Sequence, residues 1–321
     1  MPVIDKSLKV LHEYQGSSPC PEDFDEFWER ALSEMNRTDS KVELVEADFQ
    51  TRNAHCYDLY FTGTGGSRIH AKYVRPKEIT KPVPTLLQFH GYSGNCGDWW
   101  DKLAFVNAGF AIAAMDCRGQ GGLSQDLGGV KGNTHKGQII RGLDDEPDKL
   151  LFRQIFLDTA QLAKIVMSFE EVDEELVGAF GSSQGGGLTV ACAALEPRIA
   201  FAAPIHPFLS DYKRVWDMDL DVKAYAELRD YFRQFDPTHK REAEVFYRLG
   251  YIDIQNLAPR IQGEVLWGMG LMDDVCPPST QFAAYNKINA NKKLRIYPDF
   301  GHETLPGMVD EILQFFSEFV H

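Results

Sequence analysis

The segment Gly181-Ser182-Ser183-Gln184-Gly185 carries the clearest chemical signal in the sequence. It lies between an apolar run and a helix-like run, which is the context of a GxSxG turn that leads a strand sharply into a helix. In such a turn, small residues at Gly181 and Gly185 let the backbones approach, and a strained Ser183 is exposed as a nucleophile. The Gln184 N–H, at the start of the helix, is an expected oxyanion donor. The alternative is a chance match in a loop, which the flanking runs disfavour.

A serine hydroxyl is a weak nucleophile, so it needs a base and a residue that orients the base. When the nucleophile follows a strand in this way, the partners come later in the order Asp, His, and each is expected after a strand. Asp273 follows one apolar run, and His302 follows the last one. We expect His302 to be the general base and Asp273 to orient it. Asp274 is an open alternative to Asp273, and a capping or turn role is the structural alternative for either aspartate.

A second oxyanion donor is expected in the loop after the third strand of the sheet. The sequence there is His90-Gly91-Tyr92-Ser93-Gly94, and the Tyr92 N–H is the candidate. His90 is interpreted as a hydrogen-bonded structural residue, because a lone histidine beside a glycine turn is more often that than a metal ligand. We expect neither a metal nor a cofactor.

The segment Arg118-Gly119-Gln120-Gly121-Gly122 follows another apolar run. A guanidinium at this point could hold backbone carbonyls or a carboxylate beneath the Ser183 turn. A phosphate-binding glycine loop is the weaker alternative, because the GxGxxG and Walker spacings are absent.

Short apolar runs alternate with helical patterns after Pro84, which is typical of parallel βαβ units. Before them, β-branched and aromatic stretches between Val42 and Val74 surround the turn Gly63-Thr64-Gly65-Gly66 and predict antiparallel opening strands. We predict an α/β fold with a mostly parallel central sheet flanked by helices. The predicted strands of the parallel part are Leu86–Phe89, Phe110–Met115, Leu176–Phe180, Ile199–Ala203, Val265–Trp267 and Leu294–Tyr297.

Residues 1–321 are predicted to form one domain with two additions. Residues 1–40 have amphipathic spacing typical of a helical brace on the main body. Residues from about 211 to about 261 are charged and aromatic, and they predict a helical cap inserted over the carboxyl edge of the sheet.

The composition excludes several classes of function. A formal charge of -14 opposes broad contact with nucleic acid or with anionic membranes. The sequence shows neither a secretory signal nor a membrane span, so we expect a cytoplasmic protein. The six cysteines form no CxxC pair, so neither a disulfide framework nor a zinc site is indicated.

Together these residues resemble the acetyl xylan esterase/cephalosporin C deacetylase family, carbohydrate esterase family 7, within the α/β-hydrolase superfamily. The resemblance rests on an RGQ motif, Arg118-Gly119-Gln120, on a GxSQG elbow ending at Gly185, and on the terminal pair His302-Glu303. Ser182 departs from the glycine that is common beside the nucleophile. The resemblance covers nearly the whole chain, from the Pro21–Trp28 segment to the last helix.

The resemblance implies a serine esterase that deacetylates small acetylated sugars, such as xylo-oligosaccharides, and cephalosporin C. It also implies an intracellular homo-hexamer with its sites around an inner chamber, assembled through a β-hairpin whose equivalent here is Asp58 to Tyr73. Two alternatives stay open: a hydrolase of other ester or peptide specificity, and a noncatalytic scaffold that binds a partner. Trp99 and Trp100 are candidates for the entrance, although aromatic pairs at a helix start more often belong to a core.

Overall fold

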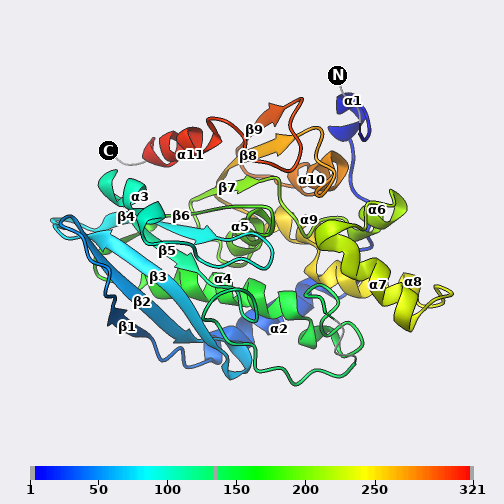
Figure 1. Ribbon diagram of the computed structural model, residues 1–321, viewed down its shortest axis with the longest axis horizontal. Coiled ribbons are helices and arrows are strands. Elements are labelled where there is room, and N and C mark those ends of the chain that lie inside the picture. The colour runs from blue at the N-terminus through cyan, green and yellow to red at the C-terminus, as the bar shows by residue number, and fades with distance from the viewer. Residues whose placement is uncertain (1–3, 133–135, 319–321) are drawn as a thin grey trace.

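A mixed sheet runs through the centre of the computed structural model, which describes residues 4–132 and 136–318. Within these residues the sheet has nine strands in the order β1-β2-β3-β5-β4-β6-β7-β8-β9. Their bounds are β1 Glu43–Glu46, β2 Ala54–Thr62, β3 Arg68–Pro76, β4 Val83–Phe89, β5 Ala111–Met115, β6 Val172–Ser182, β7 Phe201–Ile205, β8 Glu264–Gly270 and β9 Lys292–Tyr297. Figure 1 shows β1, β2 and β3 at one end of the sheet and β8 and β9 at the other.

The type of strand pairing changes once along the sheet, from antiparallel to parallel at β5. The pairs β1–β2, β2–β3 and β3–β5 are antiparallel, whereas β4–β5, β4–β6, β6–β7, β7–β8 and β8–β9 are all parallel. This confirms the predicted fold class, a mostly parallel sheet with antiparallel opening strands. The predicted hairpin turn lies between β2 and β3, where Gly65 and Gly66 adopt positive φ values of 69° and 84°. Glycine allows these values without a steric cost.

Helices cover both faces of the sheet and bury the apolar side chains that its strands carry on each face. Side chains alternate along a strand, so in β4 Leu87 faces one hydrophobic core and Leu86 faces the other. The first core is covered by α2 (Phe24–Arg37), α4 (Leu151–Met167), α5 (Gln184–Leu195) and α10 (Pro278–Tyr285). The second is covered by α3 (Leu103–Asn107) and α11 (Met308–Ser317). Continuous apolar runs are expected for strands buried on both faces.

The amino-terminal segment lies on the first face of the sheet. It contains α1 (Leu8–Leu11) and α2, whose buried residues recur at the spacing of one helical face and include Phe24, Phe27, Trp28, Ala31 and Met35. Trp28 stacks on Phe156 of α4 and donates its Nε1–H to the carbonyl of Tyr251 at 3.1 Å. The segment is thereby held against both the sheet layer and the insertion.

The chain between β7 and β8 is helical, although these two strands are neighbours in the sheet. Residues 211–261, all of them described, form α6 (Tyr212–Asp217), α7 (Ala226–Phe235), α8 (Glu242–Leu249) and α9 (Ile254–Leu257), and they contain no strand. Trp216, Phe232 and Phe246 pack against one another with ring centroids 4.7 to 6.1 Å apart. In Figure 1 α6, α7 and α8 project to one side of the sheet, whereas α9 lies close to α5.

One predicted strand is shifted by two residues. The sequence places a strand at Ile199–Ala203, but β7 runs from Phe201 to Ile205. The Ile199 N–H instead closes a turn with the carbonyl of Glu196 at 3.0 Å. The strand therefore ends directly before His206, a residue that the sequence prediction left outside the site.

Candidate active site

Ser183 lies at the point where β6 passes into α5. Its backbone has φ 59° and ψ -120°, a conformation that non-glycine residues rarely adopt. A Cβ added at Gly185 would lie 2.0 Å from the Phe89 carbonyl oxygen, and one added at Gly181 would lie 2.6 Å from it. Both positions therefore require glycine, because the strand β4 backbone passes too close for any side chain. The turn has the geometry that the sequence predicts for a nucleophile elbow.

The structure brings Ser183, His302 and Asp273 together in one hydrogen-bonded chain. Ser183 Oγ lies 2.9 Å from His302 Nε2, and His302 Nδ1 lies 2.9 Å from Asp273 Oδ2. A carboxylate only accepts, so Nδ1 donates to Asp273 and Nε2 is left to accept the Ser183 hydroxyl proton. This is the arrangement that a serine nucleophile, its base and an orienting carboxylate require.

Asp273 rather than Asp274 makes the contact with His302. Asp273 is fully buried, and its Oδ1 accepts the N–H groups of Val275 at 2.9 Å and Cys276 at 2.7 Å. Asp274 is about half exposed and pairs with Lys223 at 2.8 Å. The structure thus places Asp273, and not Asp274, in contact with His302.

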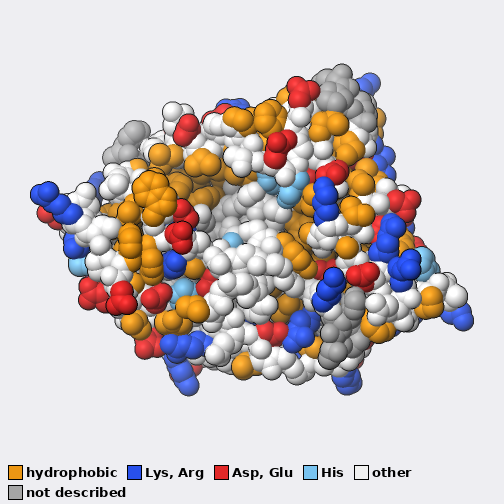
Figure 2. Space-filling view, viewed as in Figure 1, with side chains coloured by type: hydrophobic (Ala, Val, Ile, Leu, Met, Phe, Trp, Pro, Cys, Tyr) orange, Lys and Arg blue, Asp and Glu red, His pale blue; other side chains and the backbone are white. Residues whose placement is uncertain are grey.

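The three residues come from the carboxyl ends of β6, β8 and β9, which meet at one edge of the sheet. The face seen in Figure 2 is hollowed near its centre, and histidine side chains lie at the edge of the hollow. His302 keeps a fifth of its side chain exposed, while Asp273 beneath it is closed to solvent. A substrate can therefore reach the serine and the imidazole but not the carboxylate.

Tyr92 and Gln184, the two predicted oxyanion donors, lie on neighbouring segments. Gln184 is the first residue of α5, and the first amides of a helix have no acceptor within it. Tyr92 lies in the turn after β4, where its hydroxyl donates to Glu227 and its ring packs at 5.5 Å from Phe208. The insertion thereby holds the turn that carries the Tyr92 amide.

Gln120 connects these two segments, a role that the sequence alone did not suggest. Its side-chain amide exchanges two hydrogen bonds with the Gln184 amide, at 2.9 and 3.0 Å. Its Oε1 also accepts the Ser93 N–H at 2.9 Å. Gln120 therefore fixes the turn after β4 against the first residue of α5.

The remaining motif residues brace the loops around this centre. Arg118 forms a two-point ion pair with the fully buried Asp158 of α4, at 2.6 and 2.7 Å, and donates to the Thr64 carbonyl at 3.1 Å. Gly119 has a positive φ of 69°. Glu303 is exposed and accepts the Gly301 N–H at 3.0 Å, which holds the turn just before His302.

His90 makes hydrogen bonds through both ring nitrogens. Nδ1 donates to the Gly91 carbonyl at 2.7 Å, and Nε2 accepts the Cys117 N–H at 3.0 Å. Burial lowers the pKa of His90, which favours the neutral ring that these two bonds require. The ring joins the loops after β4 and β5, as the structural interpretation of this histidine expected.

His206 contacts His302 although the sequence prediction did not include it. It follows β7 directly, at the same sheet edge as the other site residues, and its ring centroid lies 4.5 Å from that of His302. Its Nε2 is 2.7 Å from Ser182 Oγ. The sequence prediction ended this strand at Ala203, so His206 was not recognised as the residue that follows it. A histidine at the carboxyl end of a parallel strand is a candidate for the site.

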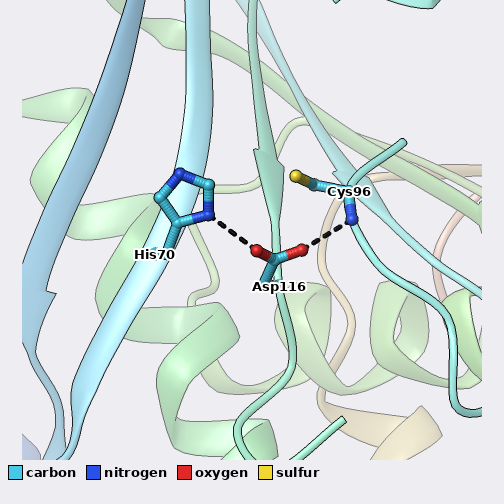
Figure 3. A group of neighbouring side chains, drawn as sticks. All are labelled: His70, Cys96 and Asp116. Carbon is cyan, nitrogen blue, oxygen red and sulfur yellow. Dashed lines mark hydrogen bonds and ion pairs between the residues drawn. The ribbon is translucent and has the colours of Figure 1, made fainter. Parts of the chain in front are cut away.

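Among the described residues, His70, Cys96 and Asp116 form a second buried cluster with possible metal donors. Figure 3 shows Asp116 between the other two, accepting from the Cys96 backbone N–H at 2.7 Å and contacting His70 Nδ1 at 2.6 Å. The other ring nitrogen of His70 contacts Asp58 at 2.8 Å. Burial and Asp116 raise the pKa of the Cys96 thiol to about 12, which favours the protonated thiol. We interpret the cluster as a structural junction between strands and loops.

A polar cavity of ≈ 310 Å³ lies beside the Tyr92 turn. Its lining includes Tyr92, Ser93, Gln138, Lys223, Glu227 and Asp230. Lys223, in its lining, is also the partner of Asp274, which follows Asp273 in the chain. Burial raises the pKa of Glu227, whose two oxygens accept from Tyr92 and from the Ile140 N–H.

Trp99 and Trp100 lie away from these contacts. Trp99 stacks on Phe49 and lies under the Lys72 ammonium at 4.7 Å, while Trp100 is 73% exposed. No helix in residues 4–132 or 136–318 is both long and apolar enough to cross a membrane.

One family model matches almost the whole chain. The acetyl xylan esterase (AXE1) family matches residues 1–319. An acetyl esterase of Xylanibacter ruminicola is 27% identical over 321 residues, covering 94% of this chain and 71% of that protein.

Two solved structures are similar over almost the whole chain. The crystal structure of acetyl xylan esterase 1 from a Thermoanaerobacterium species is 62% identical, with a TM-score of 0.97, and the match covers 98% of this chain and 99% of that one. An acetyl xylan esterase from a Paenibacillus species is 35% identical, with a TM-score of 0.93 and the same coverage of both chains. With its nine-stranded hydrolase sheet and this match along its length, the chain belongs to the acetyl xylan esterase family of carboxylic ester hydrolases.

Proposed function

We propose that the protein removes O-acetyl groups from small acetylated sugars, such as xylo-oligosaccharides, and from cephalosporin C, through an acetyl-enzyme intermediate. The observation that supports this most directly is the hydrogen-bonded chain from Asp273 through His302 to Ser183, with both links at 2.9 Å. Membership of the acetyl xylan esterase family supports acetate as the acyl group.

In the first step His302 Nε2 takes the Ser183 hydroxyl proton while Oγ bonds to the acetyl carbonyl carbon. The oxyanion that forms accepts from the Tyr92 and Gln184 amides. The C–O bond to the sugar then breaks, and His302 returns the proton to the leaving sugar oxygen. Asp273 holds the imidazole with Nδ1 as the donor and stabilises the imidazolium between the two transfers.

In the second step water replaces the sugar hydroxyl. His302 takes a proton from the water, whose oxygen attacks the acetyl carbon. The bond between the acetyl carbon and Ser183 Oγ then breaks, Oγ regains its proton from His302, and acetic acid leaves and ionises to acetate in solvent. No redox step occurs, so a serine, an imidazole and water suffice for this reaction.

The cavity beside the Tyr92 turn supports small polar substrates. Its volume of ≈ 310 Å³ suits a substrate of one or two sugar rings better than a polymer, and its lining offers carboxylate, amide, hydroxyl and ammonium groups to sugar hydroxyls. The family resemblance further supports a cytoplasmic homo-hexamer, which light scattering after size-exclusion chromatography tests. A monomeric mass would contradict it.

A substrate panel tests the proposed activity. Initial rates on acetylated xylose, cephalosporin C, long-chain acyl esters and peptides should be high for the two acetyl substrates alone. Ser183→Ala should abolish turnover, and a fluorophosphonate should label the unmodified protein at Ser183, as read by mass spectrometry. Preference for long acyl chains or peptides would replace the deacetylase assignment, and wild-type turnover by Ser183→Ala would remove the mechanism.

A further inference from the structure

The contact between His206 and His302 is not explained by the proposed reaction. Asp273 and Ser183 already occupy both nitrogens of His302, so His206 adds no bond to it. Its ring instead packs on the His302 ring, with centroids 4.5 Å apart and planes inclined by 46°. His206 is 4% exposed, so this is a buried, tilted ring contact rather than a chance surface neighbour.

Ser182, the residue before the nucleophile, makes a hydrogen bond with the His206 ring. Its Oγ lies 2.7 Å from His206 Nε2, whereas His206 Nδ1 is buried and has no hydrogen-bond partner among the described residues. Burying an unpaired N–H is more costly than leaving a lone pair unpaired, so the proton belongs on Nε2, which donates to Ser182. This one bond fixes the orientation of the ring.

The backbone around His206 is fastened to the nucleophile itself. The Ser183 N–H donates to the Ile205 carbonyl at 3.0 Å, and the Phe208 N–H donates to the Ser183 carbonyl at 2.9 Å. The His206 N–H donates across to Gly268 at 2.7 Å. Because these bonds surround His206, its ring keeps a constant position relative to Ser183.

We propose that His206 is a positioning residue for the base: Ser182 fixes its ring, and the ring confines the His302 imidazole to the orientation that bridges Asp273 and Ser183. This inference rests on the proposed function, because it gives His302 the role of the base. It also assigns a purpose to Ser182, where the family commonly has glycine.

The charge of His206 is compatible with this role. Burial and the neighbouring His302 lower the pKa of His206 to about 4, so its ring is neutral at neutral pH. A second cation would oppose the imidazolium that His302 becomes during the reaction. A neutral ring can pack on that cation without repelling it.

Kinetics of Ser182→Ala, His206→Ala and the double variant test the proposal. Turnover is measured per site that a fluorophosphonate labels, so that unfolded protein does not count. A misplacement of about 1 Å can cost roughly 100-fold in rate. We therefore expect His206→Ala to lower kcat about 10- to 100-fold with KM changed less than about twofold, and the rate of fluorophosphonate labelling to fall in parallel.

Ser182 should act only through His206. Ser182→Ala should lower kcat about 3- to 10-fold in the wild-type background and have no effect in the His206→Ala background. His206→Phe, which retains a ring, should recover most of the activity. It also provides a second background for Ser182→Ala if His206→Ala does not fold.

Phe201→Leu is the matched control, because Phe201 is buried in β7, the strand that ends just before His206, but packs on α11. It should lower the melting temperature and leave kcat per labelled site unchanged. Wild-type kcat in His206→Ala, or an equal effect of Ser182→Ala in both backgrounds, would overturn the proposal. An active Ser183→Ala variant would instead show that the proposed function has failed.

Discussion

Asp253→Asn should make the protein more stable at neutral pH. Asp253 is completely buried at the end of the insertion, where it accepts the Asp211 N–H at 3.0 Å and the Gln255 N–H at 3.1 Å. Burial, together with the nearby Asp211 carboxylate, raises its pKa from 3.8 to about 6. The folded protein therefore binds the proton more tightly than the unfolded chain does.

The sign of the effect follows from this difference. Between pH 4 and pH 6 the folded state retains a proton that the unfolded state has lost, so the free energy of unfolding falls as the pH rises through this window. The difference between the unfolded pKa of 3.8 and the folded pKa of about 6 corresponds to about 3 kcal/mol in the free energy of unfolding. This stability is lost completely only above the folded pKa. Asparagine carries no charge at any pH, so it does not contribute this dependence on pH.

Urea unfolding between pH 4 and pH 8 measures the effect. The free energy of unfolding of Asp253→Asn minus that of the wild type should rise by about 3 kcal/mol from pH 4 to pH 7. Asp219→Asn, at a side chain that is 94% exposed, is the control and should show a flat difference. A flat difference for Asp253→Asn as well would refute the reasoning.

Three further predictions concern the candidate site and its supports. Asp273→Asn should lower kcat by about 10⁴-fold, whereas Asp274→Asn should leave it within about threefold, as steady-state rates on an acetyl ester will show. Arg118→Met should lower the free energy of unfolding by about 3–5 kcal/mol, because Asp158 would be left buried without its partner. Chemical denaturation measures this change, and the double variant Arg118→Met/Asp158→Leu should recover the stability. Gln120→Leu should reduce kcat by about tenfold or more and also lower the melting temperature, because the buried Gln184 amide loses its partner; an unchanged kcat would show that the oxyanion loop is held by other contacts.

Local patterns in the sequence were sufficient for the fold and for the residue types of the site. Apolar runs that alternate with helical spacing predicted the parallel sheet, because strands buried on both faces cannot carry polar side chains. The elbow was predictable for a similar reason. The turn at Ser183 leaves no space for a Cβ at Gly181 or Gly185, and this requirement is visible in five consecutive letters.

The choice between Asp273 and Asp274 was not available from the sequence. Both follow β8 and both are aspartates, and only the path of the loop turns one toward His302 and the other toward Lys223. The partner of Arg118 was similarly hidden, because Asp158 lies within a helix pattern in which nothing indicates an ion pair.

The sequence by itself determined the parallel and antiparallel parts of the sheet, the elbow, and the positions of Ser183 and His302, because each depends on neighbours only a few residues away. Tertiary structure alone decided which side chains touch across the sheet edge, including Gln120 with Gln184 and His206 with His302. Such contacts join residues that are 64 and 96 positions apart in the sequence. Their formation depends on where the strands end and how the loops pack, which periodicity does not encode.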